Sequence, residues 1–263
     1  MIIVKIGGGA SINIKGIISD LAEQDNRFII VHGANALRDQ LADELGYPKK
    51  SVTSVSGYSS VLTDEKALDI MMMAYAGLKN KRIVELCQQH GINAVGLSGV
   101  DGKVIQSKRN KGIRVKQNNK LMLLKDLSGK AFSINKSLLD LLLNNNYTPV
   151  LCVPTIDENN VATNSENDDI VAVLQKEFAA RMILQLIEAP GLLKEKSDDN
   201  SLITQLSQTE LEQIENEVEG RMKRKILALR KLFEAGNTTV IISDGRTETP
   251  IKDALNGKGT TIK

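Results

Sequence analysis

The sequence predicts an α/β protein, a three-layer sandwich in which a mainly parallel β-sheet lies between two layers of helices, with a projecting β-hairpin region. Two observations predict this fold. Short β-branched runs alternate with segments of helical period, and these runs are apolar on both faces, as in parallel strands that helices cover. No repeat, low-complexity tract or Pro/Gly/Ser linker divides the 263 residues, so we expect one domain over 1–263.

The individual elements follow from this alternation. Strands are expected at six apolar runs, residues 2–6, 27–32, 93–97, 148–153, 181–186 and 238–243. Helices are expected near residues 15–24, 35–45, 63–90, 136–145, 168–179, 209–217, 221–235 and 250–256. Thr63 is the expected N-cap of the third helix, because Asp64 and Glu65 behind it favour the positive end of a helix.

One stretch, residues 103–127, interrupts the alternation. It is polar and hairpin-like, and the Asn118-Asn119 pair suits the positive φ angles of a tight turn. We therefore expect this segment to project from the sheet.

Composition excludes several classes of function. With 34 basic and 32 acidic residues the net charge is only +2, too small for bulk binding of nucleic acid. No apolar stretch approaches the roughly 18 residues of a membrane span, and Met1 opens directly into a strand, so we expect a soluble cytoplasmic protein. Cys87 and Cys152 lack a CxxC pattern or a nearby Cys/His cluster and are interpreted as buried thiols of a reducing compartment.

Two glycine-containing turns are candidate anion sites. Lys5 lies near the carboxyl end of the first strand and precedes three glycines at 7–9, and residues 32–35 (HGAN) end the second strand. The spacing matches neither the Walker nor the Rossmann phosphate-binding motif, and an ordinary tight turn is the alternative. Because ligands of open α/β sheets bind outside the carboxyl ends of the strands, the two turns could form one cradle. His32 has no second ligand nearby, which favours a hydrogen-bonded structural role.

Two charged segments are further candidates. Residues 164–169 (NSENDD) lead into a helix, where Asn164 could bind a substrate amide or carboxylate and Asp168 could hold two lysines; helix capping is the alternative. Residues 220–225 (GRMKRK) place cations at the start of a helix, against the helix dipole. This unfavourable placement indicates anion binding, with a solvated basic face as the alternative.

In order along the chain, these motifs resemble the amino-acid kinase family, in its acetylglutamate kinase branch, from Met1 to Lys263. The matching segments are VKIGGG at 4–9, VHGAN at 31–35, LTDEKALDI at 62–70, residues 77–102, NSENDD at 164–169, EAPGLL at 188–193, GRMKRK at 220–225 and the final DGR and GTTIK. Within the family the chain looks most like the kinases that act on an amino acid carried by the small acidic protein LysW. The resemblance implies the fold of carbamate kinase.

The resemblance also implies a reaction and the residues that perform it. ATP with Mg²⁺ would phosphorylate the side-chain carboxylate of carrier-linked glutamate or 2-aminoadipate, and no protein side chain would bind the metal. An acid-binding lobe would span about 1–178 and a nucleotide-binding lobe about 179–263. The catalytic residues would be Lys5, Lys225 and Asp168; the substrate-binding residues Gly33, Ala34, Asn35, Val61 and Asn164; and the nucleotide-binding residues Gly7, Gly8, Glu188, Ala189, Gly191 and Leu192. A carboxylate attacks phosphorus without a general base, which agrees with the lack of a catalytic histidine.

Two positions depart from the family pattern. The second glycine expected after His32 is Ala34, and the arginine that relatives place before Leu62 on the substrate carboxylate is Val61. An isopropyl group cannot replace a bidentate arginine. Either Lys66 or Arg38 supplies the contact, or the chain recognises a different acid.

Partners are expected at two surfaces. The basic hairpin would bind the acidic carrier, above all through Lys108, Arg109, Lys111 and Arg114, although a solvated exposed hairpin is the alternative. The helix at 63–80, rich in methionine, would form a homodimer as in relatives, with ordinary core packing as the alternative. Two other functions stay open. One is a kinase of the same family that acts on a free small acid or a phosphate monoester, such as acetylglutamate, uridylate or isopentenyl phosphate. The other is a non-catalytic regulatory or carrier-binding homologue.

Overall fold

The computed structural model describes residues 1–263 except 56–58, 118–119, 196–197, 218–219 and 235; the side chains of 59–60, 117, 217 and 220–225 are also outside the description. Its centre is an eight-stranded sheet in the order β16-β18-β17-β13-β1-β2-β10-β5. The strands are β1 (Ile2–Ile6), β2 (Phe28–His32), β5 (Ala94–Ser98), β10 (Thr148–Cys152), β13 (Met182–Ile187), β16 (Gln205–Leu206), β17 (Thr239–Asp244) and β18 (Thr260–Ile262). All neighbours pair in parallel except β17 and β18.

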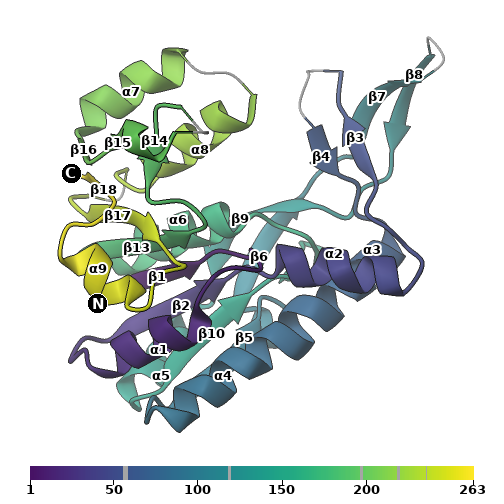
Figure 1. The fold of residues 1–263 in the computed structure, drawn as a ribbon. Coiled ribbons are helices and arrows are strands. Elements are labelled where there is room, and N and C mark those ends of the chain that lie inside the picture. Colours follow the sequence, from purple (N-terminus) through teal and green to yellow (C-terminus); the bar gives the residue numbers. More distant parts are fainter. Residues whose placement is uncertain (56–58, 118–119, 196–197, 218–219, 235) are drawn as a thin grey trace.

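Helices cover both faces of this sheet, which confirms the predicted three-layer sandwich (Figure 1). On one face lie α1 (Ile14–Ala22), α4 (Asn80–Gln89) and α9 (Pro250–Leu255); on the other lie α5 (Lys136–Asn144), α6 (Asn167–Phe178), α7 (Gln208–Glu217) and α8 (Gly220–Lys231). Each face of the sheet packs against its own hydrophobic core, and alternate residues of a strand point to opposite faces. Ile3 therefore packs on one side of β1 and Val4 on the other. The apolar runs seen in the sequence are therefore strands buried on both faces.

The long helix expected at 63–90 has three parts. These are α3 (Glu65–Met72), a π-helical segment η1 (Met73–Lys79) and α4, and α2 (Asn35–Glu44) packs beside them. The predicted cap is wrong by one residue. Asp64 accepts a hydrogen bond from the amide of Ala67 at 3.0 Å, whereas Thr63 is buried and its amide donates to Asp126 at 2.8 Å.

A second layer of strands stands at one side of the molecule. A four-stranded sheet contains β6 (Ile105–Arg109), β9 (Gly129–Ile134), β11 (Thr155–Ile156) and β12 (Ala162–Thr163). Beyond it project two hairpins, β3 (Ser51–Thr53) with β4 (Ser59–Val61) and β7 (Ile113–Gln117) with β8 (Lys120–Leu124), which we call the arm (Figure 1). The remaining short elements are η2 (Asp101–Lys103), η3 (Asp199–Ser201), β14 (Leu192–Leu193) and β15 (Leu202–Ile203).

The projecting hairpin is thus confirmed, but it is shorter than predicted. Residues 105–109 belong to the four-stranded sheet, and only β7 and β8 form the hairpin. The Asn118-Asn119 turn lies outside the described residues. Over the residues that the structure describes, none of the helices is both long and apolar enough to cross a membrane.

Candidate active site

The two glycine turns meet at one edge of the sheet. β1 and β2 are parallel, with Ile6 opposite His32, so the turns that follow the two strands lie side by side at the same edge of the sheet. A Cβ built on Gly8 would lie 2.7 Å from the amide nitrogen of Ala34 and 2.6 Å from that of Asn35. A Cβ on Gly33 would lie 2.7 Å from the amide of Gly8. Only glycine permits this approach of two backbones, and the result is a cluster of amides suited to an anion.

Lys5 and Asp168 form an ion pair beside this cradle. Their residues are 163 positions apart, and they meet because α6 packs against β1 and β2. The Lys5 side chain is 14% exposed and that of Asp168 is 35% exposed. Burial raises the pKa of the neighbouring Asp169. Asp168 is the acid that pairs with Lys5, and its side chain stays partly exposed.

Lys225, the third predicted catalytic residue, has a side chain outside the described part of the structure. Its helix is described: α8 starts at Gly220 and packs against α6. The fold therefore brings the helix that carries Lys225 next to the helix that carries Asp168.

The turn at 188–192 follows β13 and borders the cradle from the other side. The Glu188 carboxylate accepts hydrogen bonds from the amide and hydroxyl of Ser11 at 2.9 and 2.5 Å, and these bonds lower its pKa. A Cβ on Gly9 would overlap this carboxylate. Ala189 lies in the same turn, which ends where the amide of Leu192 donates to the Thr260 hydroxyl at 2.8 Å.

Gly191 is required in this turn, because a Cβ there would lie 2.6 Å from the Thr260 hydroxyl. Sequence reasoning did not find Ser11 or Thr260. Ser11 stands two residues after the last glycine and Thr260 lies within the final GTTIK segment, so only their positions beside recognised motifs could have indicated them.

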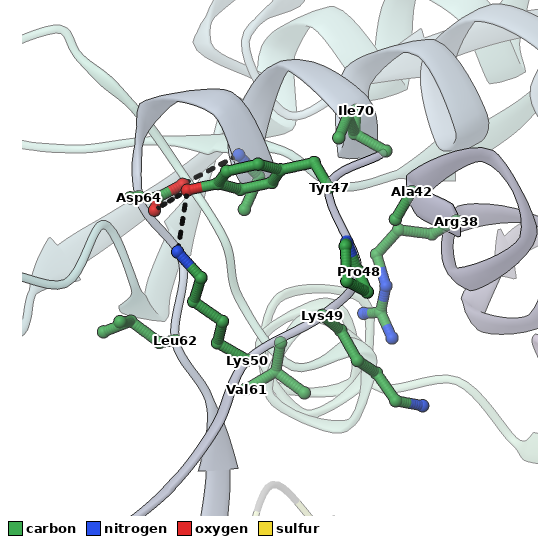
Figure 2. A pocket seen from close by; sticks show the side chains of 11 residues that line it. Arg38, Ala42, Tyr47, Pro48, Lys49, Lys50, Val61, Leu62, Asp64 and Ile70 are labelled. Atoms are coloured by element: carbon green, nitrogen blue, oxygen red, sulfur yellow. Dashed lines mark hydrogen bonds between the residues drawn. The ribbon is translucent and has the colours of Figure 1, made fainter. Parts of the chain in front are cut away.

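Asn164 and Val61 are the two predicted substrate-binding residues outside the glycine turns. The Asn164 side chain donates to the Thr63 hydroxyl at 3.1 Å, and its backbone pairs with Leu127 and Gly129. Val61 borders a small pocket between α2, α3 and the arm, shown in Figure 2. The pocket is lined by Arg38, Ala42, Tyr47, Pro48, Lys49, Lys50, Val61, Leu62, Asp64, Ala67 and Ile70.

This pocket bears on the arginine missing at Val61. Arg38 lines the pocket together with Val61, and its guanidinium is held by Asp39 at 2.6 Å. Lys66 is not among the lining residues; its ammonium group lies 4.7 Å from the centre of the Tyr47 ring. Of the two predicted replacements, Arg38 is therefore the cation that shares a pocket with Val61.

A buried network supports the second glycine turn from behind. The Tyr75 hydroxyl, in η1, donates to the Asn35 side chain, and the Tyr75 ring stacks on His32 at 6.5 Å between centroids. Asn80 donates to the His32 Nε2 at 3.2 Å and to the Val150 carbonyl at 3.0 Å. His32 thus has the structural role predicted for it, and the network joins the π-helical segment to the turn.

Because Asn35 is a predicted substrate-binding residue, we expect Tyr75→Phe to weaken binding of that acceptor substrate more than turnover. The variant loses one hydrogen bond that orients Asn35, worth about 0.5–1.5 kcal/mol, which corresponds to roughly a 2- to 12-fold change. Steady-state kinetics should show KM for the acceptor rising within this range, with KM for the nucleotide unchanged. Equal losses for both substrates would contradict a role confined to this turn.

Burial of His32 makes stability depend on pH. Burial lowers the pKa of this imidazole from 6.5 to about 4. Between these values the unfolded chain binds a proton that the folded chain does not, so the free energy of unfolding should fall by about 2 kcal/mol from pH 7 to pH 5 through this group. Urea denaturation at both pH values measures the loss. A His32→Asn variant should lose this part of the dependence; if its slope equals that of the wild type, the assignment is wrong.

The chain belongs to the amino acid kinase family, whose sequence profile matches residues 1–244. It is similar over 100% of both chains to the LysW-aminoadipate kinase of Thermus thermophilus, with 38% identity over 269 residues. The LysW-aminoadipate/LysW-glutamate kinase of Sulfolobus acidocaldarius is 29% identical over 268 residues, again covering 100% of both chains. Among solved structures, carbamate kinase of Giardia superimposes with a TM-score of 0.68 at 15% identity, covering 99% of this chain and 97% of that one.

Proposed function

We propose that this protein is a kinase that uses ATP to phosphorylate the side-chain carboxylate of 2-aminoadipate or glutamate carried by LysW, in lysine or arginine biosynthesis. The observation that carries this proposal is the Lys5–Asp168 ion pair beside the amides of two interlocked glycine turns. Its family and the named relatives agree with the reaction. The product is an acyl phosphate.

The chemistry requires positioning and charge stabilisation. A carboxylate oxygen of the acceptor forms a bond to the γ-phosphorus as the bond to the β,γ-bridging oxygen breaks, and ADP leaves with that electron pair. Lys5 and Lys225 would neutralise the transferring oxygens from two sides, and Asp168 would hold the lysines in place. The ion pair orients Lys5 before any ligand binds.

The nucleotide would bind across the first glycine turn and the 188–192 turn. The backbones of Gly7 and Gly8 would approach the phosphates, and Glu188, Ala189, Gly191 and Leu192 would line the adenine side. Mg²⁺ bound to the phosphates would offset their charge. The phosphates would supply ligands of this ion, and no protein side chain is proposed to bind it.

The acceptor would bind over the second glycine turn. Amides of Gly33, Ala34 and Asn35 would hold the reacting carboxylate, with Asn164 on the substrate backbone. Arg38 would take the role of the arginine missing at Val61, because both residues line one pocket.

LysW would bind at the basic strands β6 and β7 and the segment between them. Lys108, Lys111 and Arg114 are exposed there, whereas Arg109 donates to the buried carboxylate of Asp157 at 3.0 Å. The three exposed cations are therefore freer than Arg109 to meet an acidic partner.

Two further features belong to this proposal. The acid-binding lobe, residues 1–178, and the nucleotide-binding lobe, residues 179–263, would adjoin where β1 pairs with β13.

We also expect a cytoplasmic homodimer through the helix at 63–80, where Met73 and Leu78 are exposed. Light scattering at micromolar concentration should report twice the chain mass of 28.7 kDa, and a monomer would contradict the dimer.

The test of function is acyl phosphate formation trapped as a hydroxamate. The enzyme would receive ATP and Mg²⁺ with LysW-linked aminoadipate, LysW-linked glutamate or free acetylglutamate, with Lys225→Ala as the control. Turnover of carrier-linked acids alone, lost in the control, supports the proposal. Turnover of free acetylglutamate alone would indicate a kinase of a small free acid instead of the proposed function. No turnover of any of the three substrates would favour a non-catalytic homologue.

A further inference from the structure

The two faces of the β7–β8 hairpin differ in character. Residues directly opposite in an antiparallel pair share a face, so Arg114 with Leu123 and Lys116 with Leu121 lie on one face. We call these four residues the basic-leucine face. The opposite face carries Ile113, Val115, Met122 and Leu124.

Exposure distinguishes the two faces. On the basic-leucine face Leu121 is 66% exposed and Leu123 is 61% exposed, and both cations are exposed. On the other face Val115 is only 8% exposed and Ile113 and Leu124 are half-buried, while Met122 is 44% exposed. The hairpin therefore packs with most of one face and presents two leucines beside two cations with the other. Side chains of this size in such an exposed cluster indicate a surface that another molecule covers.

The surrounding charge favours an acidic occupant. Residues 105–125 contain seven basic and no acidic residues, and residues 51–61 of the neighbouring hairpin contain no charged residue. Two copies of this face would repel one another, which disfavours a second copy of the chain as the occupant. An acidic protein with apolar side chains between its carboxylates would satisfy both the leucines and the cations.

The arm also connects this face to the pocket that Val61 and Arg38 line. The amide of Val55, in the β3–β4 hairpin, donates to the carbonyl of Arg114 at 2.9 Å. The same hairpin ends at Val61, which lines the pocket, and the amide of Leu62 donates to Lys50 at 2.8 Å. The β3–β4 hairpin therefore links the β7–β8 hairpin, which it contacts through Val55, to the pocket, which it borders through Val61.

We propose that the basic-leucine face is the docking surface for the acidic carrier, and that Leu121 and Leu123 contribute an apolar contact in addition to the charge attraction of Arg114 and Lys116. This inference rests on the proposed function. The charge attraction brings the carrier to the arm and weakens as salt increases. The leucines slow dissociation of the carrier, and their contribution does not depend on charge screening by salt.

The experiment compares a double variant, Leu121→Ser with Leu123→Ser, with Met122→Ser on the other face of the same strand. Calorimetry would measure the Kd of LysW carrying 2-aminoadipate, and the hydroxamate assay would measure its KM. In the double variant we expect Kd and KM each to increase at least tenfold, and in the control we expect each to change less than twofold. The same differences should be found at 0.5 M salt. Thermal unfolding of each variant verifies that it is folded.

The outcomes separate the two proposals. If the wild type phosphorylates loaded LysW and the double variant binds it equally well, the docking surface is wrong and the function stands. If the double variant loses dimerisation while keeping its affinity for LysW, the face belongs to a second copy. If the wild type neither binds nor phosphorylates loaded LysW, both proposals fail.

Discussion

Lys5→Met should reduce kcat about a thousandfold or more while leaving the protein folded. The substitution keeps most of the side-chain volume and removes the charge next to the transferring oxygens, and the loss of one such group from a preorganised site is large. Asp168 would lose its partner but stays partly exposed, so the cost in stability should be small. The hydroxamate assay measures the rate, and fluorescent nucleotide displacement measures ATP binding.

A matched control is Lys15→Met, because Lys15 is an exposed lysine on α1. It should retain wild-type kcat. If Lys5→Met retained more than a tenth of the wild-type rate, the ion pair with Asp168 would have a structural role and the proposed mechanism would be wrong.

Gly8→Ala should abolish most activity by a different route. The added methyl group would lie 2.6–2.7 Å from two backbone amides of the second turn, and neither backbone can yield as a flexible side chain would. The turns must separate, at a cost of about 1–3 kcal/mol in stability and with the cradle opened. We expect kcat/KM to fall about 100-fold or more and the unfolding midpoint in urea to decrease.

Gly77→Ala is the comparison for this variant. Gly77 lies in η1, and a Cβ there would meet only the Met72 carbonyl at 3.7 Å, an ordinary contact. Alanine in a helix should stabilise the fold by about 0.5–1 kcal/mol. A loss of activity in Gly77→Ala as large as in Gly8→Ala would show that close backbone approach is not the reason for the Gly8 result.

The layers and the main strands could be predicted because their signal is local. Runs such as 2–6 and 148–152 are apolar on both faces, and few other folds use such runs between helices. The glycine turns could be located from the sequence, but three glycines after a strand also fit an ordinary tight turn, and only the fold shows that the two turns meet.

Other features depend on contacts that no local pattern contains. The choice of Asp168 over Asp169 as the partner of Lys5 follows from the orientation of α6 on β1. The bond from Tyr75 to Asn35 starts from a π-helical segment, where the sequence predicted an ordinary helix. Of the two candidate replacements for the arginine missing at Val61, Arg38 lines a pocket with Val61 and Lys66 does not, which only the arrangement of α2 and the arm shows.

The position of β1 in the sheet has a consequence for synthesis on the ribosome. β1 is translated first, but one of its two neighbours, β13, begins only at Met182. Until that strand leaves the exit tunnel, one edge of β1 has unpaired amides and carbonyls, which can template wrong pairing. The loop that must close is also long, which slows correct pairing. Nascent chains stalled before Met182 should therefore aggregate and bind chaperones, whereas chains extended well beyond Ile187 should not.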